Sequence, residues 1–129
     1  MAKFKFNKLV RDKIVGNIKK SGDTPQYKIL SDAEYIKELK RKLIEECNEI
    51  ANSSKNNLPE EIADIQDIID SIIYSFKISN KDIKGIQSQK RKKSGSFKKK
   101  IYIETVETKE DSEWNQYYRK NPAKYPEVK

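Results

Sequence analysis

Two groups of carboxylates stand near the middle of the chain, at spacings that suit a metal site. They are Glu45-Glu46-Cys47-Asn48-Glu49 and Glu61-Ile62-Ala63-Asp64. Residues three apart on a helix share one face, so each group would direct two carboxylates the same way. Four such anions repel one another unless a cation lies among them, and an all-oxygen cluster suits Mg²⁺ or Mn²⁺.

Two helices with apolar stripes would have to position these carboxylates. The first stripe is Ile36, Leu39, Leu43, Cys47 and Ile50, and the second is Ile62, Ile65, Ile69, Ile72, Ile73 and Phe76. At 100° per residue, Glu46 and Glu61 lie roughly 60–70° from the centres of their stripes, and Glu49 and Asp64 roughly 120–130°. If the stripes pack antiparallel, the four carboxylates converge at one rim of the interface.

Local signals predict a mainly α fold. Ser31 and Glu34 have the spacing of a capping box, so a helix should begin near Asp32 and run to about Ala51. Pro59 suits the first turn of a second helix that ends near Phe76. A short helical pattern before Gly22 and a polar helix ending near Ser94-Gly95 flank this pair. Short β segments are expected near residues 26–30 and 100–107.

The composition excludes several classes of enzyme. The chain has no histidine, which rules out Ser-His-Asp and Cys-His catalysis and His-ligated zinc. Its single cysteine, Cys47, lies on the apolar stripe and is expected to be a core thiol. One cysteine provides no disulfide framework, and no apolar run has the length of a membrane span or a signal peptide. We therefore expect a soluble, cytoplasmic protein with no membrane partner.

The net charge of +8 is unevenly distributed over the 129 residues. Residues 31–80 carry an excess of acids, whereas residues 1–30 and 81–100 are strongly basic. This polarity would suit a multiply charged anion, bound through metal on one side and through Lys or Arg on the other. The glycines fit no phosphate-binding loop, so any phosphate group would have to be bound by metal and by side chains. The candidate substrate-binding residues are Arg11, Lys13, Lys90, Arg91 and Lys93.

These residues resemble the all-α nucleotide pyrophosphohydrolases, the MazG-like and phosphoribosyl-ATP pyrophosphohydrolase-like superfamily. Its signature is EExxE on one helix and ExxD on the next. The subgroup that opens with a KLVRDKI-like segment is similar to residues 8–14, and its basic helix, Gly/Phe step and strand are similar to residues 90–107. The likeness covers roughly residues 5–108. The family step is often Gly-Gly-Phe, whereas this chain has Gly95-Ser96-Phe97.

The resemblance implies a specific activity and specific roles. The metal ligands would be Glu46, Glu49, Glu61 and Asp64, and Glu45 would be a catalytic carboxylate. With Mg²⁺, or Mn²⁺ in its place, the enzyme would hydrolyse a nucleoside triphosphate or related nucleotide to monophosphate and pyrophosphate. The resemblance also implies a helical bundle over residues 1–108 that a homodimer or dimer of dimers completes. Residues 109–129 form a tail that the sequence does not place, and both a docked or partner-binding segment and a disordered one fit its composition.

Other interpretations of the same residues remain open. The carboxylates of the first group could form a solvated helix face that pairs with Lys37, Arg41 and Lys42. The chain could also be a basic helical module that binds nucleic acid, although its acidic centre would repel that partner. A catalytically silent dimer that binds a partner protein is the third alternative. The sequence does not reveal the preferred base or sugar.

Overall fold

The computed structural model describes residues 1–54 and 56–129, and the regular secondary structure of these residues is helical. The helices are α1 (Ile14–Lys20), α2 (Asp32–Asn52), α3 (Leu58–Ser75), α4 (Asn80–Ser94) and α5 (Glu113–Lys120). The prediction of a mainly α fold is therefore confirmed. None of these helices is both long and apolar enough to cross a membrane.

The chain divides into two compact units, residues 1–89 and residues 90–129, and the boundary falls within α4. The first unit contains α1, α2 and α3, and with them both groups of carboxylates. The second unit contains α5 and the end of α4. The domain boundary expected at residue 108 stays a prediction.

The start of α2 follows from its capping residues. The backbone N–H of Glu34 donates to Ser31 Oγ at 3.3 Å, and the backbone N–H of Ser31 donates to Glu34 Oε1 at 3.3 Å. The predicted capping box is thus formed. Hydrogen bonds from the Ser31 side chain and backbone, together with the nearby charge of Lys28, lower the pKa of the Glu34 carboxyl.

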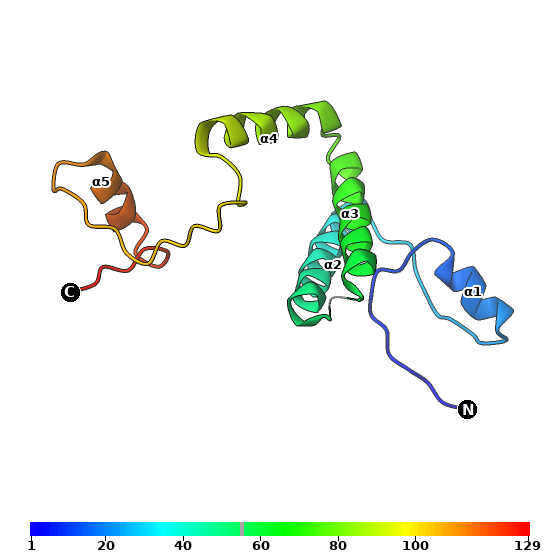
Figure 1. Ribbon diagram of the computed structural model, residues 1–129. Helices are drawn as coiled ribbons and strands as arrows, with labels where there is room; N and C mark the ends of the chain where they lie inside the picture. The colour runs from blue at the N-terminus through cyan, green and yellow to red at the C-terminus, as the bar shows by residue number, and fades with distance from the viewer. Residues whose placement is uncertain (55) are drawn as a thin grey trace. The chain divides into compact units, whose positions relative to one another are not determined.

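Helices α2 and α3 lie side by side and antiparallel (Figure 1). Leu39 of α2 and Ile68 of α3 are only 3% and 6% exposed, and they are the buried apolar side chains among the described residues. Lys40, in the first half of α2, holds its Nζ 5.7 Å from the ring centroid of Phe76, just past the end of α3. The helix pair is therefore antiparallel, which was the condition for the carboxylates to approach one another, and it encloses a very narrow core.

The buried faces of the two helices are rotated from the predicted apolar stripes. Cys47 is exposed rather than a core thiol, so that prediction was wrong. Ile62, Ile69 and Phe76 of the second stripe are also exposed, whereas Glu46 is buried. The physical reason is that each helix packs against a single neighbour. A broad apolar stripe then buries only one edge, and here that edge is the one nearer the carboxylates.

The β segments expected near residues 26–30 and 100–107 are absent from the structure as described, and both stretches are irregular. Ile29, Ile101 and Ile103 are largely exposed. β-Branched residues favour a strand only where another strand and a packing face are present, and neither stretch has such a partner in the described chain. The prediction of short strands was wrong for this reason.

The C-terminal unit is organised around α5, whose first turn is capped by the Ser112 hydroxyl. Buried Asn115 donates to Thr108 Oγ1 at 2.8 Å and accepts a hydrogen bond from Arg119 Nε at 2.9 Å. Arg119 also pairs with Glu127 at 3.3 Å. One aromatic cluster accompanies this network and consists of Trp114, Tyr117, Tyr118 and Tyr125. The tail that the sequence left unplaced thus contains a capped helix.

Candidate metal centre

Glu46 is the most deeply buried carboxylate of the described chain. The residue is 7% exposed, and its Oε2 atom has no hydrogen-bond partner among the described residues. Burial raises the pKa of the Glu46 carboxyl, and the charge of Glu49 and a hydrogen bond that protonated Glu46 can share with Glu49 raise it further. The charge of Asp64 acts in the same direction, and Lys42 opposes it. A buried carboxylate that faces other carboxylates favours a cation as its missing partner.

Of the other predicted ligands, Glu49 and Asp64 lie near enough to Glu46 for their charges to raise its pKa. Glu61 and Asp64 lie one turn apart on α3 and are half-buried, and Glu49 is exposed one turn beyond Glu46 on α2. The Oε2 atom of Glu61 is also buried and lacks a hydrogen-bond partner within the described residues. Two oxygens of the predicted ligand set are therefore desolvated and unpaired.

The carboxylates of the described chain do not converge on a single point. Among the described residues, no three acidic or cysteine side chains are close enough to hold one ion in their present positions. The all-oxygen donor set and the two unpaired oxygens fit a hard divalent cation. Binding would require the side chains to move inward from the two helices.

Arg11 occupies the α3 side of this cluster. Its Nη2 donates to Asp64 Oδ1 at 2.7 Å, and its Nη1 donates to Asp67 Oδ2 at 2.6 Å. These bonds, that to Asp67 first, raise the pKa of the guanidinium above its already high ordinary value. The side chain of Arg11 is 57% exposed and that of Asp64 is 43% exposed, so solvent screens the pair. Arg11 therefore spans two carboxylates one turn apart, and one of them is a predicted metal ligand.

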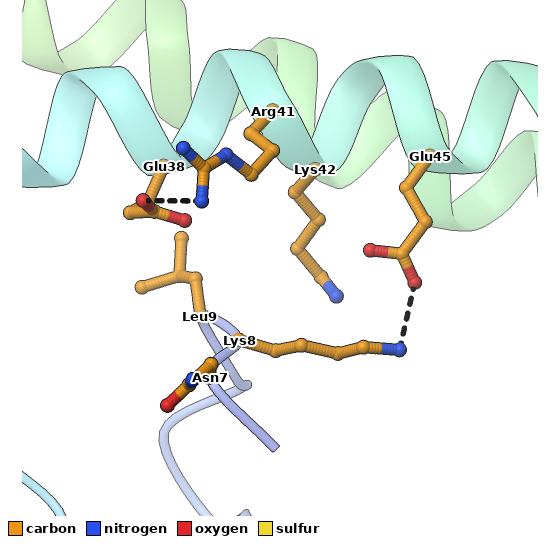
Figure 2. A pocket seen from close by; sticks show the side chains of 7 residues that line it. All are labelled: Asn7, Lys8, Leu9, Glu38, Arg41, Lys42 and Glu45. Atoms are coloured by element: carbon orange, nitrogen blue, oxygen red, sulfur yellow. Dashed lines mark hydrogen bonds and ion pairs between the residues drawn. The ribbon is translucent and has the colours of Figure 1, made fainter. Parts of the chain in front are cut away.

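Glu45, the predicted catalytic carboxylate, lies beside the N-terminal segment. Its Oε1 accepts from Lys8 Nζ at 3.2 Å, and this pair forms one side of a small pocket (Figure 2). The Arg41 guanidinium and Glu38 pair at 3.3 Å along the opposite side. The pocket has a volume of about 20 Å³, room for roughly one water molecule. A pocket of this size cannot enclose a nucleotide.

The predicted phosphate-binding residues fall in two groups. Arg11 contacts the acidic cluster directly, and Lys13 lies exposed at the first residue before α1. Lys90, Arg91 and Lys93 are exposed in the last turns of α4 and belong to the second unit. Their role with a nucleotide stays a prediction from the sequence.

Two residues outside the predicted ligand set contact the candidate site. Lys8 pairs with Glu45, and Asp67 shares the guanidinium of Arg11 with Asp64. For Asp67 the signal was present, because it follows Asp64 by three residues and so lies on the same face of α3. For Lys8 the sequence held no such signal, since its partner lies on another element.

Comparisons with protein families, with curated proteins and with solved structures found no match for this chain.

Proposed function

We propose that this protein is a Mg²⁺-dependent nucleotide pyrophosphohydrolase, which hydrolyses a nucleoside triphosphate to monophosphate and pyrophosphate. The observation that carries the proposal is the buried carboxylate of Glu46, which has one unpaired oxygen and lies near the charges of Glu49 and Asp64. A buried, ionised carboxylate in that position lowers the stability of the fold unless a cation binds it. Glu46, Glu49, Glu61 and Asp64 supply the oxygens that such a cation needs.

The alternative of a solvated, salt-bridged helix face accounts poorly for these contacts. Arg41 pairs with Glu38, and the cation beside Glu45 is Lys8. Within the described residues, no Lys or Arg forms an ion pair with Glu46, Glu49 or Glu61. A surface that existed only for solubility would expose Glu46 rather than bury it.

The residues around the cluster have complementary tasks in this reaction. Bound Mg²⁺ would polarise the phosphoanhydride and make a water molecule more acidic. Glu45 would accept a proton from the attacking water, and its carboxylate accepts a hydrogen bond from the Lys8 ammonium at 3.2 Å. Arg11 supplies a planar, forked cation that matches phosphate oxygens.

A second copy of the chain fits the same proposal. The outer edge of α3 exposes Ile62, Ile69 and Phe76, which recur every seven residues and so form one stripe. An exposed apolar stripe of this kind is typical of a helix that packs against a partner. We therefore propose a homodimer, or a dimer of dimers, in which this stripe is covered.

Product analysis tests the activity. Purified protein would be incubated with a panel of nucleoside triphosphates, with Mg²⁺ or with EDTA, and the products separated by ion-exchange chromatography. The proposal expects monophosphate and pyrophosphate with Mg²⁺ only, from at least one nucleotide. Orthophosphate as the sole inorganic product, or no turnover of any nucleotide with Mg²⁺ or Mn²⁺, would refute it.

A further inference from the structure

Arg11 is bound to the acidic cluster in a way that competes with a metal ion. Its Nη2 donates a hydrogen bond to Asp64 Oδ1 at 2.7 Å, and its Nη1 donates one to Asp67 Oδ2 at 2.6 Å. Asp64 is a proposed metal ligand, and Asp67 is not. One side of the guanidinium therefore lies on the candidate metal centre, and the other is anchored beside it.

We propose that Arg11 is an exchangeable counterion. It pairs with Asp64 in the metal-free protein, and it binds a substrate phosphate instead once Mg²⁺ coordinates Asp64. The inference rests on the proposed function, since it assigns Arg11 a positioning role toward that metal centre. Asp67 retains the Nη1 side of the guanidinium during the exchange. The released Nη2 side then remains within reach of an anion bound to the same metal.

The exposure and chemistry of the contact favour such an exchange. Because both partners of the Arg11–Asp64 pair are substantially exposed, the ion pair is screened and opens at little cost. A divalent cation attracts Asp64 more strongly than a single guanidinium does. The guanidinium is also suited to two-point hydrogen bonding with phosphate, so it has a new partner when substrate arrives.

The exchange predicts that loss of Arg11 changes the affinities for Mg²⁺ and for phosphate in opposite directions. Both affinities can be measured without turnover. Calorimetry would give the Kd for Mg²⁺ alone and, at saturating Mg²⁺, for inorganic tripolyphosphate, which probes phosphate binding independently of the base. Arg11→Gln removes the competitor, so Mg²⁺ should bind about two- to fivefold more tightly. The same variant should bind tripolyphosphate about tenfold or more weakly.

Two further variants separate the effect of charge from that of geometry. Arg11→Lys keeps the charge but cannot span two carboxylates, so its Mg²⁺ affinity should lie between those of wild type and Arg11→Gln. Lys20→Gln removes the same charge from an exposed residue at the end of α1, which is not among the candidate phosphate-binding residues. Its Kd for Mg²⁺ should stay within about twofold of the wild-type value.

The outcomes distinguish this inference from the proposed function. Tighter Mg²⁺ binding together with weaker tripolyphosphate binding in Arg11→Gln supports the exchange. Suppose instead that wild type binds Mg²⁺ and that Glu46→Gln weakens this binding. If Arg11→Gln then leaves the Kd values for Mg²⁺ and tripolyphosphate unchanged, or weakens the binding of both, only the role of Arg11 is overturned. If wild type shows no Mg²⁺ binding that depends on Glu46, the metal centre fails and the exchange fails with it.

Discussion

The ionised carboxylate of Glu46 is disfavoured by both its burial and its neighbours. It is buried, lacks a partner for one oxygen, and faces the charges of Glu49 and Asp64. Because its pKa in the folded protein is raised above the unfolded value, the stability it contributes is present at low pH, below the unfolded pKa. That stability is lost as the pH rises through the folded pKa, unless a cation compensates the carboxylate.

Replacement of Glu46 by glutamine should therefore stabilise the metal-free protein at neutral pH. The expected gain is about 1 kcal/mol at pH 7, the order of the penalty for a buried unpaired polar group. The gain should shrink as the pH falls toward 4, where glutamate is also neutral. Urea unfolding of wild type and Glu46→Gln in EDTA, from pH 4 to pH 8, measures both features.

A matched substitution on the exposed side of α3 provides the control for this experiment. Asp70→Asn also removes one carboxylate charge from the helix pair, but Asp70 is exposed, so the unfolding free energy of this variant should stay close to that of wild type at every pH. Equal stability of wild type and Glu46→Gln at every pH would show that the buried carboxylate carries no penalty.

That the candidate ligands lie on two neighbouring helices could be predicted from the sequence, whereas their environment could not. Helical spacing placed Glu46, Glu49, Glu61 and Asp64 on neighbouring elements, and the structure brings these elements together. The burial of Glu46 depends on which edge of the apolar stripe meets the neighbouring helix, which periodicity within one helix cannot determine. The partners of Glu45 and Asp64 lie more than thirty residues away along the chain and leave no periodic signal.

At the scale of the elements, the helices could be predicted because their signals are local. A capping box, a proline in the first turn and positive-φ glycines at positions 22 and 95 all act within a few residues of a helix end. The two expected strands failed because pairing is a property of two segments. β-Rich composition at residues 100–107 gives no information about a partner.

The capping box at the start of α2 offers a prediction with its own pH dependence. Ser31→Ala should lower the unfolding free energy by about 1 kcal/mol at pH 7, since it removes the oxygen that caps the Glu34 N–H. Ser31 also lowers the pKa of Glu34, so the part of the cap that involves the Glu34 carboxylate is present above the unfolded pKa of glutamate and is lost as the pH falls through the folded pKa. The hydrogen bond from the Glu34 N–H to Ser31 Oγ does not depend on that titration. Thermal unfolding followed by circular dichroism would measure the difference.

Ser88 serves as the matched serine for that comparison. It is exposed within α4 and lies away from the ends of the helix. Ser88→Ala should change the unfolding free energy by no more than a few tenths of a kcal/mol, roughly the difference in helix propensity. A Ser31→Ala variant as stable as Ser88→Ala at pH 7 would mean that the capping box contributes nothing.

At the scale of the whole molecule, a single chain buries very little apolar surface. Leu39 and Ile68 form the buried apolar core of the described residues, and much of the α3 stripe remains exposed. A chain of this length with so narrow a core is expected to gain its stability by association. The proposed dimer accounts for the exposed stripe and for the narrow core at once.

A charge placed on the exposed stripe should break this association. Ile69→Glu puts a carboxylate at the centre of the stripe, so light scattering at micromolar concentration should show a shift from dimer or tetramer to monomer. Tyr74→Glu is the control, because Tyr74 is exposed about 140° around the helix from Ile69. A monomeric, fully active wild-type protein would overturn the proposed assembly.

The most direct test of the metal centre is a titration of Mn²⁺ into the protein, with free Mn²⁺ followed by electron paramagnetic resonance. Wild type should bind the ion, and Glu46→Gln, Glu49→Gln, Glu61→Gln and Asp64→Asn should each weaken binding by roughly ten- to a hundredfold. Asp70→Asn should bind as tightly as wild type. Wild-type protein that leaves Mn²⁺ free, or four variants that bind it as wild type does, would contradict the metal centre on which the proposed function depends.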